Sequence, residues 1–273
     1  MAIQRQDGTG EVYRRGIVVA SNVSVKTYSE FCNEEPRIPV QYRLVDGEII
    51  AYEVPLDPHA VVQGELNFVM NGWNRRLLRV IGEVDIIIGP RSVYRPDLSI
   101  RPNQRQRPPF RQAINSSGNP YPTMVVEIGN TESIRSLHEL VAGYFSPRTT
   151  IQIYLAIKLF PPRQDGTIAL LALLYLCNNQ NPTVPTIAKS FGTAPLHVSV
   201  QNYLHNVAGV PADGITGIGF GSGPCNGANI PEYQIAIPTI SLFNGVIGGI
   251  PNGVPNNFSI DLWNLHDEML NNL

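Results

Sequence analysis

The sequence predicts an α/β fold, a mixed β-sheet flanked by helices, with an N-terminal hairpin and a loop-rich C-terminal extension. Runs rich in Val, Ile and Leu alternate with amphipathic segments along the chain, which is typical of sheets covered by helices. Asp46-Gly47 separates two strand-like runs, 41–45 and 48–54, and therefore predicts a tight hairpin. With 43% hydrophobic residues, a chain of 273 residues can bury a sizeable core.

Two amphipathic helices are expected beside this sheet. One runs from Pro58 to about Arg79, and Asp57 is placed to cap it. Its apolar positions follow steps of three and four residues, which place them on one face: Val62, Leu66, Val69, Trp73 and Leu77. The other helix is expected over 133–145, and 27–31 is expected to form only a short helical turn.

Most of the remaining elements are predicted strands. Aliphatic runs bounded by Gly or Pro predict five of them in the middle of the chain: 82–89, 92–101, 122–129, 150–160 and 167–177. Further on, 197–203 and 233–243 are also predicted strands, and Ser259 is expected to cap a final helix. The Gly-rich segment 217–223 is expected to be a surface loop, because no helix follows it as a dinucleotide-binding loop requires.

These elements fit one domain that follows a short extension. Residues 1–25 are the expected extension, and 26–273 are expected to form a single domain. Its core lies at about 26–177, and 178–273 add a loop-rich β extension and the closing helix.

Two of the predicted strands each carry one acid among apolar neighbours, Asp97 and Glu127. Burying a carboxylate is costly unless a cation or hydrogen-bond donors compensate it. If the two strands pair, carboxylates at matched heights can share a hard divalent ion such as Mg²⁺ or Mn²⁺. The structural alternative is that Asp97 accepts hydrogen bonds from backbone donors and that Glu127 forms a buried ion pair with Arg95 or Arg135.

Several landmarks follow one another in order over about residues 26–160. They are a hairpin at 42–50, Pro58-His59 at a helix start, Pro96-Asp97, the strand 125–128, and a helix that ends near Tyr144. In this order the chain resembles the putative restriction endonuclease domain family of the PD-(D/E)XK nuclease superfamily. The resemblance implies a restriction-endonuclease-like fold and a Mg²⁺-dependent DNA endonuclease, with Asp97 and Glu127 as catalytic metal ligands.

The resemblance also implies a catalytic lysine, which this chain lacks at both expected places. The place two residues after Glu127 is Gly129, and the place four residues before Tyr144 is Leu140. An arginine cannot give up its proton, and a histidine is only partly charged at neutral pH. The candidates that could replace the lysine are Arg135, His138 and Lys158. Glu65, on the predicted helix before the sheet, is a candidate for an additional catalytic acid.

Arginines are concentrated beside Asp97, the single acid between positions 91 and 111. Guanidinium groups bind phosphates in a bidentate way, and backbone phosphates dominate affinity for nucleic acids. The expected nucleic-acid-binding residues are therefore those of this loop: Arg91, Arg95, Arg101, Arg105, Arg107 and Arg111. A second stripe of arginines is expected at Arg75, Arg76 and Arg79. The alternative is that the loop is only a solvated surface excursion.

Two functions agree with these observations. The first is a DNA endonuclease that hydrolyses phosphodiester bonds with Mg²⁺ or Mn²⁺ and a degenerate lysine position, acting as a homodimer if both strands are cut. The second is a catalytically inactive nuclease-fold module that binds nucleic acid or protein.

Other classes of function find no support in the sequence. Cys32, Cys177 and Cys225 lack metal-type spacing, and there is no Gly-x-Ser-x-Gly motif. The apolar run 168–177 is too short to cross a bilayer, and 1–7 lacks the apolar core of a signal peptide. We therefore expect an intracellular protein, cytoplasmic or nuclear, without a membrane partner.

Overall fold

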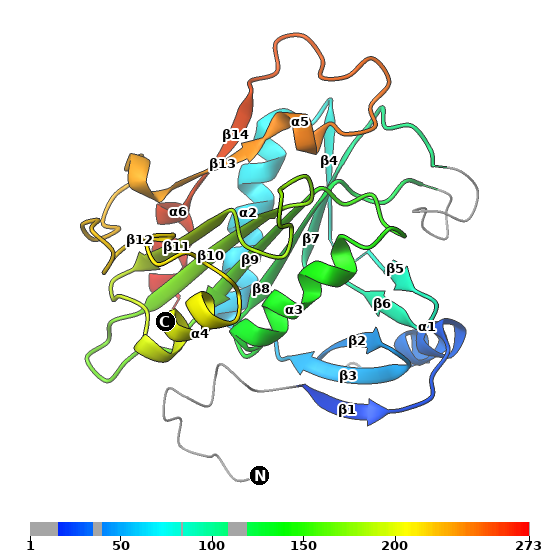
Figure 1. The fold of residues 1–273 in the computed structure, drawn as a ribbon, viewed down its shortest axis with the longest axis horizontal. Helices are drawn as coiled ribbons and strands as arrows, with labels where there is room; N and C mark the ends of the chain where they lie inside the picture. The colour runs from blue at the N-terminus through cyan, green and yellow to red at the C-terminus, as the bar shows by residue number, and fades with distance from the viewer. Residues whose placement is uncertain (1–15, 35–39, 83, 109–118, 273) are drawn as a thin grey trace.

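The structure is a computed structural model in which residues 16–34, 40–82, 84–108 and 119–272 are described. Within these ranges the strands form a seven-stranded, a five-stranded and a two-stranded sheet (Figure 1). None of the helices in the same ranges is long and apolar enough to cross a membrane. The predicted α/β class, a mixed sheet flanked by helices, is confirmed.

The seven-stranded sheet is the centre of the molecule. Its strands are, in spatial order, β12 (Ile215–Gly217), β11 (Ile187–Gly192), β10 (Ala169–Leu176), β9 (Ile153–Leu159), β8 (Met124–Gly129), β7 (Leu98–Pro102) and β4 (Leu78–Gly82). The β8–β9 and β11–β12 pairs are parallel, and the other pairs are antiparallel. Because β8, β9 and nearly all of β10 are buried on both faces, they read as continuous apolar runs.

Helices cover both faces of this sheet. The core on one face includes side chains from α2 (Asp57–Asn74) and α6 (Leu262–Leu270). The core on the other face includes side chains from α3 (Ile134–Tyr144) and α4 (Val198–Asn206), the two helices in front of the sheet in Figure 1. Along β8 the side chains alternate between these two cores, so each strand residue belongs to one helix layer.

The five-stranded sheet packs beside α3. Its strands are β1 (Ile17–Ala20), β3 (Glu48–Glu53), β2 (Gln41–Val45), β6 (Ser92–Tyr94) and β5 (Ile86–Gly89), in spatial order. The expected Asp46-Gly47 hairpin joins β2 to β3, with φ angles of 50° and 84°, which are typical of a two-residue primed turn. The helix α1 (Val25–Glu34) precedes it and is longer than the single turn that the sequence predicts.

The C-terminal part adds the two-stranded sheet of β13 (Gln234–Pro238) and β14 (Asn257–Asp261), the 3₁₀ turn η1 (Pro231–Tyr233) and the short helix α5 (Thr239–Leu242). Ile235, Ile260 and Leu265 are fully buried in the same core as α2. The extension is therefore packed onto the α2 side of the seven-stranded sheet.

Several predicted elements are confirmed with small changes of boundary. Ser133 caps α3 by accepting a hydrogen bond from the Ser136 backbone N–H at 3.1 Å. The runs 150–160 and 167–177 form the buried antiparallel pair β9 and β10.

Three other predictions are wrong. Residues 197–203 belong mainly to α4, because Val200, Tyr203 and Leu204 are buried at helical spacing. The run 92–101 is broken between β6 and β7, and 233–243 changes from β13 to α5 at Thr239.

Helix boundaries account for the remaining corrections. The long helix ends at Asn74 rather than Arg79, and Asp57 lies inside it while Leu56 is the N-cap. Asp261, not Ser259, caps α6 by accepting a hydrogen bond from the Trp263 N–H at 3.0 Å. Ser259 is part of β14.

Gly217 generates the first testable prediction. It ends β12 with a φ of 95°, and a Cβ at this position would overlap the backbone oxygen of Ser190 on β11. Gly217→Ala should therefore lower the free energy of unfolding in urea by about 2 kcal/mol. Gly223→Ala is the matched control, because a Cβ there meets no atom within 4 Å, and it should change stability by less than about 0.5 kcal/mol. Equal losses for the two variants would contradict the prediction.

Candidate active site

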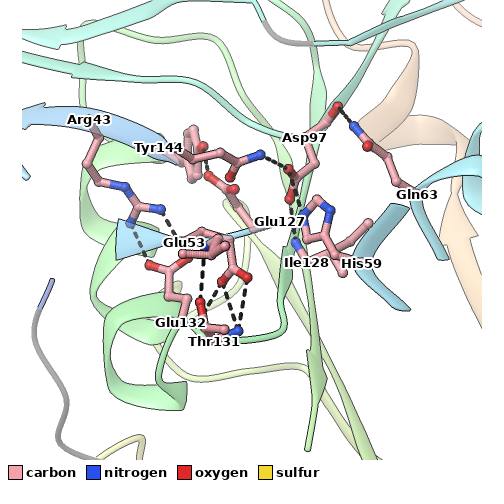
Figure 2. A network of polar contacts seen from close by, with 12 residues as sticks. Arg43, Glu53, His59, Gln63, Asp97, Glu127, Ile128, Thr131, Glu132 and Tyr144 are labelled. Atoms are coloured by element: carbon pink, nitrogen blue, oxygen red, sulfur yellow. Dashed lines mark hydrogen bonds and ion pairs between the residues drawn. The ribbon is translucent and has the colours of Figure 1, made fainter. Parts of the chain in front are cut away.

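The two acids singled out in the sequence lie next to each other. The antiparallel register pairs Leu98 with Val126, so the next step along the strands places Asp97 opposite Glu127 on the same face. Each residue is only 2% exposed. Figure 2 shows both side chains in the polar network between the two larger sheets. The two strands therefore pair, as a cation shared between the two carboxylates requires.

Asp97 is held by donors from three elements. Its Oδ2 accepts a hydrogen bond from the Ile128 N–H at 2.7 Å, and its Oδ1 accepts one from Gln41 Nε2 at 3.1 Å. His59 Nε2, at the start of α2, lies 3.1 Å from the same Oδ1. Burial opposes a charged imidazole, but the hydrogen bond to Asp97 and the charges of Asp97, Glu53 and Glu132 together outweigh burial and raise the pKa of His59. These contacts fix the Asp97 carboxylate in place.

Glu127 has a different environment. Its Oε1 accepts a hydrogen bond from the Tyr144 hydroxyl of α3. Burial raises the pKa of Glu127 well above its usual range; the charge of Arg43 opposes this effect, and the charges of Asp97 and Glu132 add to it. A cation near the Asp97–Glu127 pair would therefore favour the ionised form of Glu127.

A second pair of buried acids lies beside the first. Glu53, on β3, accepts hydrogen bonds from the backbone N–H groups of Thr131 at 2.9 Å and Glu132 at 2.6 Å. Both terminal nitrogens of Arg43 bind the Glu132 carboxylate, at 2.8 and 3.1 Å. The Ser136 hydroxyl also donates a hydrogen bond to this carboxylate. Glu53, Glu132 and Arg43 were not recognised in the sequence. Glu53 is an acid in an apolar strand, so the criterion that selected Glu127 would have selected it too.

Lys158 lies on the same sheet face as Glu127. The parallel register of β8 and β9 pairs Gly129 with Lys158, and the two-residue period places both on the Glu127 face. The lysine is 1% exposed, and its Nζ donates a hydrogen bond to the Asn130 backbone oxygen at 2.7 Å. At Gly129 itself an added Cβ would lie 2.8 Å from a methyl carbon of Leu137, so α3 fills the place of a strand lysine.

The other predicted catalytic residues do not join the acid pair. Glu65 is partly exposed on the side of α2 that faces α6, where Asn264 and Glu268 are its electrostatic neighbours. His138 Nδ1 lies 2.9 Å from the Tyr175 hydroxyl. Arg135 forms a surface ion pair with Glu139 at 2.7 Å. On α3 the side chains that contact the acids are those of Ser136 and Tyr144, and His138, two positions after Ser136, points elsewhere.

The arginines between positions 91 and 111 do not all lie free on the surface. Arg95 pairs with Asp85 at 2.8 Å. Arg105 is 9% exposed and donates to the backbone oxygens of Asn244 and Tyr121, and burial, together with the charge of Arg101, lowers its pKa to about 10. These two side chains therefore stabilise the fold.

The remaining predicted nucleic-acid contacts are more open. Arg91 and Arg107 are exposed, whereas Arg111 lies outside the described residues. Arg101 is partly exposed and donates to the Pro120 backbone oxygen at 3.0 Å, and β4 places Arg79 directly opposite it.

Two cavities lie between the five-stranded sheet and α3. One, of about 290 Å³, is lined by Arg43, Tyr52, Ser136 and Leu140 among others. The other, of about 520 Å³, is lined by Glu53, Thr131 and Glu132 and shares Tyr52 and Ser136 with the first. Glu53 and Glu132 therefore border open space on the hairpin side, whereas Asp97 and Glu127 line neither of these two cavities.

The donor set around Asp97 fits a divalent cation held by few protein ligands. Among the described residues there is no group of three or more His, Cys, Asp or Glu arranged to hold a metal. Magnesium commonly needs only one or two carboxylates, with water and phosphate oxygens completing its shell. Gln41 Oε1 and His59 Nδ1 are buried and have no hydrogen-bond partner within the described chain. Two adjacent carboxyls and an unpaired amide oxygen suit such an ion.

His138 generates a prediction about pH. Burial lowers its pKa below the usual value of about 6.5, so it binds protons more weakly in the folded than in the unfolded chain. Its contribution to stability is therefore present above about pH 6.5 and is lost as the pH falls through the folded pKa. His138→Gln should make the free energy of unfolding less dependent on pH between about pH 7 and 5. Urea titrations at several pH values test this, and an unchanged slope would contradict it.

Residues 25–165, more than half of the chain, match the Uma2 family, described as "Putative restriction endonuclease". No curated protein matches the chain. A crystal structure described as a putative nuclease belonging to DUF820 from Anabaena variabilis ATCC 29413 is 16% identical, with a TM-score of 0.42, over 67% of this chain and 98% of that chain. A likeness this distant carries no argument about the site. The family match supports a nuclease, and the chain belongs to the Uma2 family of putative restriction endonucleases.

Proposed function

We propose that the chain is a metal-dependent nuclease that hydrolyses DNA phosphodiester bonds, with Asp97 and Glu127 as the metal-holding acids. The observation that carries the proposal is the direct juxtaposition of two buried acids, Asp97 immediately before β7 and Glu127 on β8. Two ionised carboxylates opposite each other on neighbouring strands would repel each other, and the charge of Asp97 is one cause of the raised pKa of Glu127. Within the described chain neither carboxylate makes an ion pair with a lysine or an arginine. A bound cation would compensate both.

When bound, Mg²⁺ or Mn²⁺ would supply an activated water and neutralise charge on the phosphoryl oxygens. The protein residues would position that chemistry. His59, Gln41 and the Ile128 N–H hold Asp97, and Tyr144 holds Glu127. Because these contacts exist before substrate binds, little reorganisation is needed on binding.

Lys158 is the lysine that we assign to this site. It lies on the face of Glu127, beside the strand position that Gly129 leaves without a side chain. Its hydrogen bond to the Asn130 oxygen fixes the start of the segment that carries Thr131 and Glu132. We propose that Lys158 positions this segment.

We further propose that Arg79 and Arg101 bind the DNA backbone. Alternation along β7 puts Arg101 on the same face as Asp97, four residues away, which is roughly 13 Å along the strand. The cross-strand register brings Arg79 opposite it, and no ion pair compensates either guanidinium in the described chain. Two like charges in this arrangement are costly, and bound phosphates would relieve that cost. The exposed Arg91 and Arg107 are further candidates for such contacts.

The second candidate function is a nucleic-acid-binding module without cleavage. It is favoured by the apolar filling of both lysine positions, since Leu137 occupies the space at Gly129 and Leu140 is itself buried. In that case the arginines would bind DNA while the acids serve only the fold. Measurements of cleavage and of binding separate the two functions.

The nuclease proposal predicts that Asp97→Asn and Glu127→Gln each lower Mg²⁺- or Mn²⁺-dependent nicking of supercoiled plasmid by about 100-fold or more. Glu65→Gln is the matched control, because Glu65 faces α6, and it should nick at the wild-type rate. If the wild type acts as a homodimer that cuts both strands, it should also convert the plasmid to the linear form. Calorimetric Mn²⁺ binding provides a second measurement, and identical isotherms for wild type and Asp97→Asn would rule out the metal site.

The DNA-binding proposal predicts a weaker and less salt-dependent complex for the double variant Arg79→Gln/Arg101→Gln. Loss of two phosphate contacts should reduce the slope of log affinity against log salt by about 2. Fluorescence anisotropy with labelled duplex DNA in EDTA measures this without cleavage. Arg163→Gln, an exposed arginine in the β9–β10 connection, is the control and should keep the wild-type slope. A slope equally reduced in the control would show that only net charge matters.

A further inference from the structure

One face of α3 lies along both pairs of acids. Ser136, Leu140 and Tyr144 follow one another at intervals of four residues, so their side chains lie on the same side of the helix. The Ser136 hydroxyl donates to Glu132, and the Tyr144 hydroxyl donates to Glu127. Leu140 lies between them, is 3% exposed and contributes no polar group. This helix therefore contacts both acids through hydroxyl groups, while its Arg135, which also lines the cavity, is paired with Glu139 instead.

The positive charge comes instead from the opposite wall of the same cavity. Arg43, on β2, lines the cavity together with Leu140, and its guanidinium makes the two-point contact with Glu132 that Figure 2 shows. The guanidinium also lies over the ring of Tyr52, with 3.4 Å between Cζ and the ring centroid. At 3% exposure, Arg43 is held by a carboxylate and an aromatic face, which together suit a planar cation.

The orientation of Glu132 towards Arg43 is fixed by the neighbouring backbone. Glu53 accepts hydrogen bonds from the N–H groups of Thr131 and Glu132, and Thr131 Oγ1 in turn accepts one from the Val54 N–H at 3.1 Å. The segment between β8 and α3 is thus bound to the end of β3. Lys158 also binds this segment, through the Asn130 oxygen.

We propose that Arg43 is the cationic positioning residue of this site, and that it supplies from β2 the positive charge that α3 lacks at Leu140. Its guanidinium orients Glu132 and places a fixed charge next to the Asp97–Glu127 pair. The role in cleavage rests on the proposed nuclease function, whereas the placement of the charge does not. Arg43 is not among the substitutes for the lysine that the sequence indicates, which are Arg135, His138 and Lys158.

The proposal is tested by removing the positive charge from β2 and introducing one on α3. Arg43→Met leaves Glu132 buried without its partner, so the thermal unfolding midpoint should fall by about 10 °C. Adding Leu140→Lys should restore at least half of that loss, because a lysine at 140 would enter the cavity that Arg43 has left. In the wild-type background Leu140→Lys should instead lower the midpoint, since a third cation would then join Arg43 and Arg135 at one cavity.

Val141→Lys combined with Arg43→Met is the matched control. Val141 is as deeply buried on α3, but it belongs to the core between α3 and the seven-stranded sheet and does not line the cavity. The control should show no recovery. If it recovers as much as the Leu140→Lys combination, or if neither recovers, the proposal is overturned. If Arg43→Met does not fold, Arg43→Lys is used in its place. Because that variant keeps a cation on β2, adding Leu140→Lys should not raise the unfolding midpoint. A higher midpoint would overturn the proposal.

Plasmid nicking separates this inference from the proposed function. If the wild type nicks, Arg43→Met should nick at least about 10-fold more slowly, and Leu140→Lys should restore part of the rate. Recovery of stability and of rate together supports Arg43 as a positioning residue of a nuclease. Recovery of stability in a protein that never nicks would support the placement of the charge while ruling out the nuclease. Wild-type nicking rates in Arg43→Met would overturn the role in cleavage.

Discussion

The burial of four carboxyl groups in one small volume is the constraint on which the rest of this structure depends. Glu53, Asp97, Glu127 and Glu132 are each at most 3% exposed. An ionised carboxylate without compensation costs several kcal/mol to bury. Three of the four are satisfied by backbone N–H groups, by His59 and Gln41, or by Arg43, and Glu127 has the weakest compensation, a tyrosine hydroxyl. A bound cation would therefore stabilise the ionised form of Glu127 more than that of the other three carboxyls.

This constraint also explains how the two larger sheets are joined. The partners of Glu132 and Asp97 are contributed by β2, through Arg43 and Gln41, while Glu53 at the end of β3 accepts from the segment after β8. The five-stranded sheet is therefore connected to the seven-stranded sheet through charged and polar groups as well as by apolar packing. A buried network of this kind favours one relative position of the two sheets, because any shift leaves a charge unpaired.

The sequence was sufficient for the properties that depend on local pattern. The Asp46-Gly47 hairpin, the Ser133 cap and the paired strands with Asp97 and Glu127 follow from turn chemistry, capping and alternation, which act over a few residues. The role of Arg43 depends on a partner 89 positions away, so no spacing could indicate it. The short apolar alternation of residues 197–203 fits both the strand period and the helix period, and only the packed face of α4 distinguishes the two.

Arginine at this site has a consequence that lysine would not have. A lysine buried in an apolar cavity can lose its proton, because burial disfavours the charged form, whereas a guanidinium remains charged in proteins. Burial also works against the charge of Arg43, but the charges of Glu132, Tyr52, Glu127 and Tyr144 together outweigh it and keep the pKa of Arg43 well above its usual value. The acid cluster therefore keeps a permanent counter-charge at any pH at which the protein folds. A group that cannot release its proton can position charge but cannot act as a base, so any proton accepted during hydrolysis has to go to another group or to water.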